Sequence, residues 1–272
     1  MVNVVKATGE TEPFSEIKIR SSIKRAGIPQ KIQEEVVEHI KSKLYENIPT
    51  KEIYRHILEF LGQSSHPFNG TKYNLKQGIM DLGPTGYPFE DYISEILKSQ
   101  GHTTQTRQIL RGTCVSHEID VIAEKDGKRI AIEAKFHNGL GTRSDVHVAL
   151  YTKARFDDIK EKNNLDEAWI VTNTKATGDA ITYAECNGIK VIGWNYPEKG
   201  SLRDLVEETK LFPITAVTSL TQSQKQILLL HKIVLCKNIC ISPSLIKILG
   251  LHHDQEKKVL AELSYLCNLA AI

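Results

Sequence analysis

The chain has 272 residues, of which 40% are hydrophobic and 25% charged, and its formal net charge at pH 7 is +2. This composition excludes a disordered or fibrous chain and is typical of a globular protein of about two domains. The nearly neutral charge means that a surface for nucleic acid has to be local rather than spread over the molecule.

The sequence contains no segment that is long and apolar enough to cross a membrane. Its longest apolar run, Ile227 to Leu235, is far shorter than the ~20 residues that a membrane-spanning helix needs. The N-terminal sequence MVNVVKATGE has no apolar signal core. We therefore expect a cytoplasmic protein without membrane contact.

The cysteine count predicts reduced thiols. Five cysteines are an odd number in a mid-sized chain, which argues against a disulfide framework. Cys236 and Cys240 are four residues apart, a spacing that also fits half of a metal site on one helix face. No second pair of ligands lies nearby in the sequence, so we expect both side chains to pack in the core.

The first segment, residues 1–83, is expected to fold as a short hairpin about Thr8-Gly9 followed by four helices. Gly27 ends the first helix and Pro49-Thr50 begins the third. The fourth helix runs through Tyr73 to Leu82. The cluster Gly83-Pro84-Thr85-Gly86 then breaks the helical pattern, and we place a domain boundary there.

The remaining chain divides into a mixed segment, residues 84–212, and a helical segment, residues 213–272. The expected elements of the mixed segment are, in order, a helix to about Gln100, a strand at Thr103 to Leu110, a hairpin, a helix at Val146 to Asn163, a strand at Ala168 to Thr172, a helix to about Asn187, and a strand at Lys190 to Trp194. This alternation predicts an α/β fold with a mixed sheet between helices.

The last segment has helical patterns at Gln222 to Leu235, Pro243 to Leu249 and Asp254 to Leu269. Its polar residues form no basic stripe. We expect these helices to serve packing or self-association, with nucleic-acid contact as the alternative.

The central hairpin is expected to bring two acidic side chains together. Asp126-Gly127 is a strong signal for a two-residue turn, because both central positions need positive φ. The register that follows from this turn places Asp120 opposite Glu133. Since side chains alternate, Glu118 and Lys135 form the next pair on the same face. The opposite face carries the apolar residues Ile119, Val121, Ile130, Ile132 and Ala134.

Two facing carboxylates repel each other and destabilise a hairpin unless a cation lies between them. Mg²⁺ accepts one or two carboxylates, keeps several waters and completes its shell with phosphate oxygens. We therefore expect Asp120, Glu133 and the backbone carbonyl of Ala134 to hold Mg²⁺ or Mn²⁺. Lys135, beside the metal, would hold an attacking water and neutralise the charge that develops at phosphorus.

A simpler interpretation of the same face is that its charges are only solvated. In that case Lys135 pairs with Glu118 across the strands. Ala131 and Ile122 lie on the same face as the acids, which favours a partly enclosed cleft and the metal site.

Asp120 and Glu133-Ala134-Lys135 resemble the Asp and Glu-x-Lys core of the PD-(D/E)XK nuclease superfamily. The order of elements from Tyr87 to Trp194 resembles the Mrr-like restriction endonuclease branch, and YPFEDYISEILKSQGH resembles its opening helix. The resemblance implies a metal-dependent deoxyribonuclease in which Glu90, Asp120 and Glu133 are metal ligands and, with Lys135, the catalytic residues. Many relatives in this branch carry glutamine at the position of Glu133. A role in restriction or defence follows from the resemblance alone.

Several basic residues around the hairpin are candidates for a track that positions the DNA backbone, with a solvated surface as the alternative. They are Arg107, Arg111, Arg143, Lys153 and Arg155. We expect His117, at the start of a strand, to have a structural role.

The N-terminal segment resembles the ATP-cone, a regulatory nucleotide-binding domain, over residues 2 to 82. The resemblance rests on Val4-Val5-Lys6, the turn Gly9, Phe14-Ser15-Glu16-Ile17-Lys18-Ile19 and Pro49-Thr50-Lys51-Glu52-Ile53. It implies that ATP or dATP is a regulatory ligand, with Lys6 and Lys18 at the phosphates and Glu12 and Thr50 near the base or ribose. Lys72 or Lys76 would be a further lysine of this site.

The residues and the resemblances together predict an endonuclease that acts on DNA and responds to a bound nucleotide. The response requires that the nucleotide binds two arrangements of the protein unequally, for example through subunit association in a homo-oligomer. A catalytically inactive, nucleotide-gated DNA-binding or regulatory protein is the main alternative. A free-standing regulator of nucleotide metabolism leaves the acidic hairpin without a role.

Overall fold

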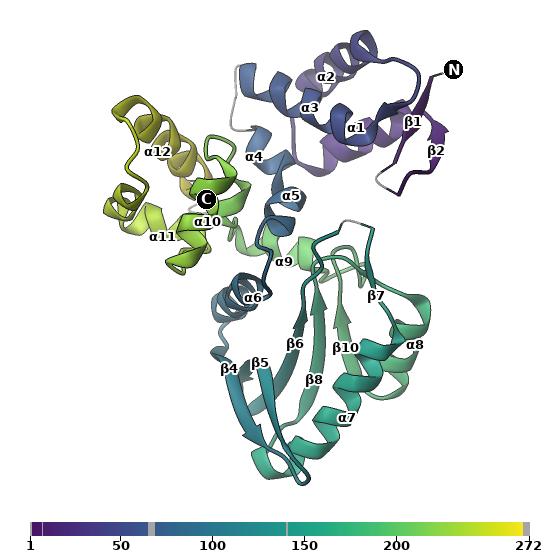
Figure 1. Ribbon diagram of the computed structural model, residues 1–272, viewed down its shortest axis with the longest axis vertical. Coiled ribbons are helices and arrows are strands. Elements are labelled where there is room, and N and C mark those ends of the chain that lie inside the picture. The colour runs from purple at the N-terminus through teal and green to yellow at the C-terminus, as the bar shows by residue number, and fades with distance from the viewer. Residues whose placement is uncertain (1, 7, 65–68, 140, 269–272) are drawn as a thin grey trace.

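The computed structural model describes residues 2–6, 8–64, 69–139 and 141–268. Figure 1 shows three units: an N-terminal unit from β1 to α3, a central unit built on a sheet, and a helical C-terminal unit. A connector of two short helices, α4 and α5, joins the first unit to the others. The α/β fold, with a small N-terminal unit, a central mixed sheet and a helical C-terminal region, is therefore confirmed.

The N-terminal unit is a small sheet covered by three helices. Its strands are β1 (Asn3–Val5), β2 (Thr11–Pro13) and β3 (Ile48–Pro49), and its helices are α1 (Glu16–Arg25), α2 (Gln30–Lys43) and α3 (Thr50–Gln63). β1 pairs antiparallel with β2, as predicted, and parallel with β3. Ser15 caps α1 by accepting from the Lys18 N–H, and Gly27, with φ +69°, follows its end.

The connector consists of α4 (Asn69–Tyr73) and α5 (Leu75–Met80). One helix was expected from Tyr73 to Leu82, and two short helices divided at Asn74 are present. The Asn74 side chain donates to the Ala216 carbonyl at 2.9 Å. Leu75 and Ile79 of α5 belong to the core of the central and C-terminal units, not to the separate core of the N-terminal unit.

The central unit is a five-stranded mixed sheet with helices on both faces (Figure 1). The strand order is β10-β8-β6-β5-β4, with β4, β5 and β6 antiparallel and β6, β8 and β10 parallel. The strands are β4 (Thr103–Arg111), β5 (Ser116–Lys125), β6 (Lys128–Lys135), β8 (Glu167–Thr172) and β10 (Ile189–Ile192).

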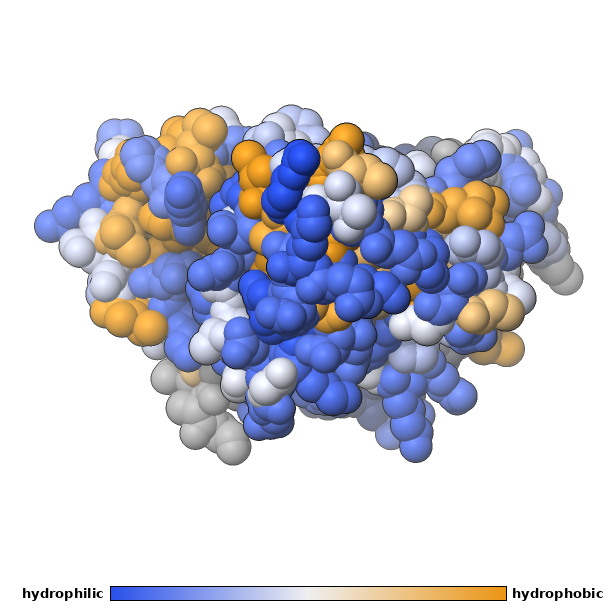
Figure 2. All heavy atoms as spheres, turned by 90° about the horizontal axis from the view of Figure 1, so that it is seen from below, coloured by the Kyte–Doolittle hydropathy of each residue, from blue (hydrophilic) through white to orange (hydrophobic). Residues whose placement is uncertain are grey.

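Helix α6 (Tyr87–Ser99) covers one face of this sheet, and α7 (Val146–Asn163) and α8 (Gly178–Cys186) cover the other. The short strands β7 (Arg143–Ser144) and β9 (Lys175–Ala176) pair in parallel beside it, and α9 (Leu202–Thr209) follows. Figure 2, a view from below Figure 1, shows a mostly hydrophilic surface with smaller apolar patches.

The C-terminal unit contains η1 (Ile214–Ala216), α10 (Gln222–Leu230), α11 (Cys236–Ile241), η2 (Pro243–Leu249) and α12 (His253–Asn268). The helix predicted from Gln222 to Leu235 ends early, because Lys232 adopts a positive φ of 58° and turns the chain toward α11. Leu269, the last residue of the third predicted helix, lies outside the described residues. Nowhere in the described ranges is there a helix long and apolar enough to cross a membrane.

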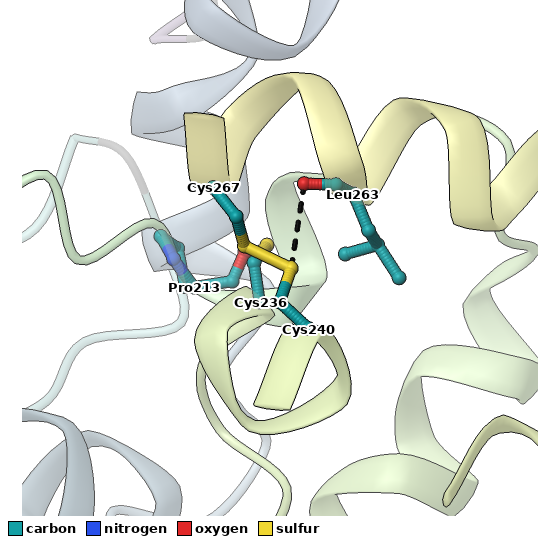
Figure 3. Close-up of a disulfide and its surroundings, with 5 residues drawn as sticks. All are labelled: Pro213, Cys236, Cys240, Leu263 and Cys267. Carbon is teal, nitrogen blue, oxygen red and sulfur yellow. Dashed lines mark hydrogen bonds between the residues drawn. A yellow bond between two sulfur atoms is a disulfide. The ribbon is translucent and has the colours of Figure 1, made fainter. Parts of the chain in front are cut away.

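The prediction of reduced thiols is wrong for two of the five cysteines. Cys240 of α11 and Cys267 of α12 form a disulfide (Figure 3). The two residues are 27 positions apart in sequence, so only the packing of α11 against α12 reveals that they are neighbours. Cys236 keeps a free thiol and is buried in the core, as expected.

Candidate active site

The turn of the central hairpin fixes the register that the sequence predicts. Asp126 and Gly127 have φ of 53° and 77°, as a two-residue turn between twisted strands requires. Lys125 lies opposite Lys128, and the ladder continues to the pair Val121 and Ile132. The next pair in this register is Asp120 and Glu133.

The backbone ladder stops at this point, and the Asp120 side chain replaces it. One carboxylate oxygen, Oδ2, accepts a hydrogen bond from the Ala134 N–H at 2.7 Å. Because the strands part here, the alternation expected along β5 is not kept. Ile119, predicted on the face opposite Asp120, instead packs with Ile122 and Ala131 under α7. That cluster encloses the face of the acids, as predicted.

Asp120 is held in an environment that disfavours its charge. Burial is the main cause and the negative charge of Glu133 adds to it, so the pKa of Asp120 rises to about 7, although the bond from Ala134 opposes this. A cation between the two carboxylates would reverse this balance. The repulsion inferred from the sequence is therefore present in the folded chain.

Glu133 is paired with an arginine from the covering helix. Nη1 of Arg155, on α7, lies 2.6 Å from Oε2 of Glu133. Arg155 is only 9% exposed and lies over the ring of Tyr151 at 5.0 Å. This pair was not predicted, since Arg155 was expected to contact phosphate and no sequence spacing connects it to Glu133.

Glu90, in the first turn of α6, has a similar partner. Its Oε2 accepts from Nη1 of Arg107 at 3.0 Å, and Arg107 also donates to Asp91 at 2.7 Å. Arg107 adopts a positive φ of 54° inside β4, which is uncommon for a residue with a side chain. Burial raises the pKa of Glu90, and the bond from Arg107 opposes this shift.

Each of the three acids keeps one oxygen without a described partner. Asp120 binds the protein through Oδ2, and Glu133 and Glu90 through Oε2. Across the described parts of the chain, no three His, Cys, Asp or Glu side chains stand together as a preformed metal cage. Mg²⁺ needs only one or two protein carboxylates because it keeps several waters, and the oxygens of Asp120 and Glu133 without a described partner match that chemistry.

Lys135, the last residue of β6, is half-buried. Its ammonium group has no carboxylate within ion-pair distance among residues 2–6, 8–64, 69–139 and 141–268. The alternative pairing with Glu118 is therefore absent from the described structure, and Lys135 follows Glu133 by two residues on the same strand.

Most of the other basic candidates are already engaged. Lys153 forms an ion pair with Asp157, and Arg107 and Arg155 hold acids of the site. Arg111 and Arg143 are exposed and have no ion-pair partner in the described structure. His117 lies 2.9 Å from Asp158, which also accepts from two backbone N–H groups of the β4–β5 loop. His117 and the β4–β5 loop thus share the carboxylate of Asp158 on α7.

The N-terminal unit brings its four candidate nucleotide ligands to one end of its sheet. Glu12 binds Lys6 at 3.1 Å and Lys18 at 2.8 Å. Thr50 begins α3 directly after Pro49, which pairs with Val5, the residue before Lys6. Glu12 thus balances part of the charge of the two lysines.

The two further lysines point to other units. Lys72 lies 5.9 Å from the ring centre of Tyr265 on α12. Lys76 lies 4.5 Å from the ring centre of Trp194 and donates to the backbone oxygen of Asn173. The resemblance to the ATP-cone implied one of these lysines at the nucleotide site, and in the structure both contact other units.

Models of three families match successive parts of the chain. The ATP cone domain matches residues 2–67, a restriction endonuclease domain of the Mrr type matches 84–195, and the C-terminal domain of AF1548-like proteins matches 212–267. The chain therefore consists of an ATP-cone domain, a restriction-endonuclease-like domain and a helical C-terminal domain, in this order. Both predicted resemblances are confirmed.

Two relatives that are matched over almost their whole length identify the family. An uncharacterized protein of Archaeoglobus fulgidus is 38% identical over 171 residues, which cover 62% of this chain and 97% of that protein. The crystal structure of AF1548, a protein of unknown function, has 35% identity and a TM-score of 0.57, and it covers 66% of this chain and 97% of that one. The chain belongs to the AF1548-like family.

A repair endonuclease from Pyrococcus abyssi is also similar, at 18% identity and a TM-score of 0.32 over 40% of this chain and 46% of that chain. This likeness is too weak to carry an argument.

Proposed function

We propose that the protein is a Mg²⁺- or Mn²⁺-dependent DNA endonuclease whose activity responds to ATP or dATP bound by its ATP-cone domain. In this proposal the regulatory domain spans residues 1–83, the nuclease domain 84–212 and the C-terminal extension 213–272. The observation that carries it is that Asp120 and Glu133 lie close enough, where two strands part, for the charge of Glu133 to raise the pKa of Asp120. Lys135, two residues beyond Glu133, has no ion-pair partner in the described structure. The match to a restriction endonuclease domain supports the same chemistry.

Each residue of the site has a separate role in the proposed reaction. Asp120, Glu133 and the Ala134 carbonyl would hold the ion, which, when bound, polarises the phosphodiester and stabilises charge on its oxygens. Lys135 orients the attacking water and neutralises charge at the scissile phosphate. Glu90 joins the ligands if Arg107 releases it, and Arg111 and Arg143 contact the DNA backbone outside the centre.

A cleavage assay on supercoiled and linear DNA with Mg²⁺ or Mn²⁺ tests this function. Asp120→Ala and Lys135→Ala are expected to lower the rate by about a thousandfold, as for loss of groups that stabilise a transition state. Glu124→Gln, at the exposed end of β5, is the matched control and is expected to change the rate less than about twofold. Unchanged cleavage by both alanine variants would reject the assignment of the site.

The second candidate is a nucleotide-gated DNA-binding protein without turnover. The observation in its favour is that arginines already hold Glu133 and Glu90. In that case Arg155 and Arg107 replace the metal permanently, and DNA binds without being cut at any concentration of Mg²⁺ or Mn²⁺.

The regulatory part is tested by titrating ATP and dATP calorimetrically. Lys6→Ala and Lys18→Ala are expected to weaken binding at least about tenfold, because each removes a charge from the phosphates. Lys24→Ala, a change at the end of α1 away from this cluster, is the control. If a nucleotide changes the state of association, sedimentation of the protein with and without it will show the homo-oligomer that the proposal leaves open.

A further inference from the structure

The segment that leaves strand β6 is fixed by one buried side chain. Asn173 follows β8 and is fully buried. It accepts from the N–H of His137 at 2.8 Å and donates to the carbonyl of His137 at 2.9 Å. The backbone pairing of β6 with β8 ends at Lys135 and Thr172, so this side chain prolongs the ladder. Asn173 thereby fixes the backbone two residues beyond Lys135.

Asn173 is in turn held by the connector. Nζ of Lys76, on α5, donates to the backbone oxygen of Asn173 and lies over the ring of Trp194. The side-chain amide of Asn173 also contacts the sulfur of Met80, at the end of α5. No carboxylate in the described structure lies within ion-pair distance of the half-buried Lys76, and burial lowers the pKa of its ammonium group to about 7.

The position of α5 depends on the ATP-cone domain. Asn74, the residue before α5, accepts from the hydroxyl of Tyr54 on α3 at 2.6 Å. The ring of Tyr54 stacks on that of Tyr73, whose hydroxyl accepts from Ser22 on α1. Tyr73 and Asn74 directly precede α5, so a change in the packing of α1 against α3 would alter contacts at the start of α5.

The same segment after β6 has further contacts with the N-terminal part of the chain. A Cβ atom at Gly83 would lie 2.7 Å from the ring of Phe136 and 2.5 Å from the side-chain oxygen of Asn138, and one at Gly141 would lie 3.5 Å from Thr8 in the β1–β2 turn. The chain that follows the Glu-x-Lys motif thus lies against Gly83, just after the connector, and comes close to Thr8 of the ATP-cone hairpin.

We propose that Lys76 and Asn173 are positioning residues of the nuclease site: Lys76 transmits the position of the ATP-cone domain to Asn173, and Asn173 sets the end of β6 from which Lys135 acts. This inference rests on the proposed function and names the route by which a nucleotide would regulate it. Asn173 holds the backbone of His137 through both its N–H and its carbonyl, so loss of this side chain is expected to loosen the end of β6 locally.

The test uses the full chain with Lys76→Met, which keeps the packing on Trp194 but removes the donor, and with Asn173→Ala. Lys76→Arg keeps a donor and a cation over the ring, and Lys199→Met, in an exposed loop, is the matched control. Two quantities are measured: amide hydrogen exchange of Phe136, His137 and Asn138, and the kcat and KM for DNA cleavage with Mg²⁺.

Lys76→Met and Asn173→Ala are expected to speed exchange at His137 at least about tenfold and to lower kcat about tenfold with KM unchanged. For Lys76→Arg, the exchange rate at His137 and the kcat are expected to lie between those of these two variants and those of the wild type. For Lys199→Met, both quantities are expected to match the wild type. Faster exchange with unchanged kcat would overturn the positioning role.

The inference and the proposed function fail in different ways. If the wild type cuts no DNA, the proposed function fails, and the exchange at His137 still decides whether Lys76 and Asn173 hold the end of β6. Unchanged exchange in both Lys76→Met and Asn173→Ala would overturn the inference even if the wild type is an active nuclease.

Discussion

Single residues at the candidate site were partly predictable from the sequence. The turn Asp126-Gly127 fixed the register, and the register placed Asp120 and Glu133 together, because pairing in a hairpin is counted from the turn. The partners of these acids were not predictable. Arg155 reaches Glu133 from a helix 22 residues further on, and such contacts depend on how the helix packs on the sheet.

Asp120 gives a prediction for the metal-free protein. Its pKa is raised from 3.8 to about 7 in the folded state, so between these values the folded chain binds more protons than the unfolded chain. Stability contributed by this group therefore falls as pH rises from about 4 to 7. Asp120→Asn removes this loss, and we expect it to be about 1 to 3 kcal/mol more stable than the wild type at pH 8 in EDTA.

Urea denaturation at pH 5 and pH 8 measures this effect. The gain from Asp120→Asn is expected to shrink toward pH 5, and Glu124→Gln serves as the control for loss of an exposed carboxylate. Equal stability of Asp120→Asn and the wild type at pH 8 would show that Asp120 is not held against its charge.

Whole elements were predictable where the hydrophobic period runs long enough. Helix α3 was predicted to begin at Pro49-Thr50 and does so, with Ile53, Ile57 and Leu61 on its buried face. The short strands β3, β7 and β9 were missed, because two residues carry no period. Helix α9 was missed although Ser201 and Asp204 form a capping box, a signal that sequence inspection can find.

The connector gives a prediction about close packing. A Cβ atom at Gly78 in α5 would lie 2.7 Å from Ala216, whereas one at Gly62 in α3 meets nothing within 4 Å. Gly78→Ala is expected to lower the free energy of unfolding by about 1 to 3 kcal/mol through overpacking. Gly62→Ala is expected to raise it by about 0.5 to 1 kcal/mol through helix propensity.

Thermal unfolding of both variants checks this contrast. Since the substitution is the same, its effect on the unfolded chain is the same, and only the packing differs. If Gly78→Ala stabilises the protein as much as Gly62→Ala, α5 does not lie against the segment at Ala216.

The disulfide between α11 and α12 gives a prediction about the C-terminal unit. Linking Cys240 to Cys267 closes a loop of 27 residue steps, which by chain entropy contributes roughly 3 to 4 kcal/mol. Cys240→Ser is expected to lower the unfolding temperature. A reductant is expected to lower it in the wild type to the value of the variant and to leave the variant unchanged. The same unfolding temperature for wild type and variant without reductant would contradict this bond.

The arrangement of the whole molecule was the least predictable part, since contacts between units join residues far apart in sequence. The carboxylate of Glu262 on α12 is an example. It is 1% exposed, and it accepts from Thr71 of the connector and from the backbone and hydroxyl groups of Thr218 and Ser219. No sequence pattern marks this residue, because its partners are 191 and about 44 positions away.

Glu262 therefore gives a prediction for the assembly of the units. Glu262→Gln replaces one acceptor oxygen by an amide donor that faces other donors. We expect this change to lower the free energy of unfolding by about 3 kcal/mol. Glu256→Gln on the same helix is the control. Denaturation followed by tryptophan fluorescence measures the loss, and a change below about 0.5 kcal/mol would mean that this network does not join the connector to α12.

The central claim is that Asp120 and Glu133 are brought together to hold a divalent ion. The most direct measurement is the anomalous diffraction of crystals of the wild-type protein grown with Mn²⁺. We predict a manganese ion bound by oxygens of Asp120 and Glu133, with Arg155 displaced from at least one of its contacts. The account would be contradicted if Mn²⁺ occupies other sites in the crystal but none between Asp120 and Glu133, and if Arg155 still contacts Glu133.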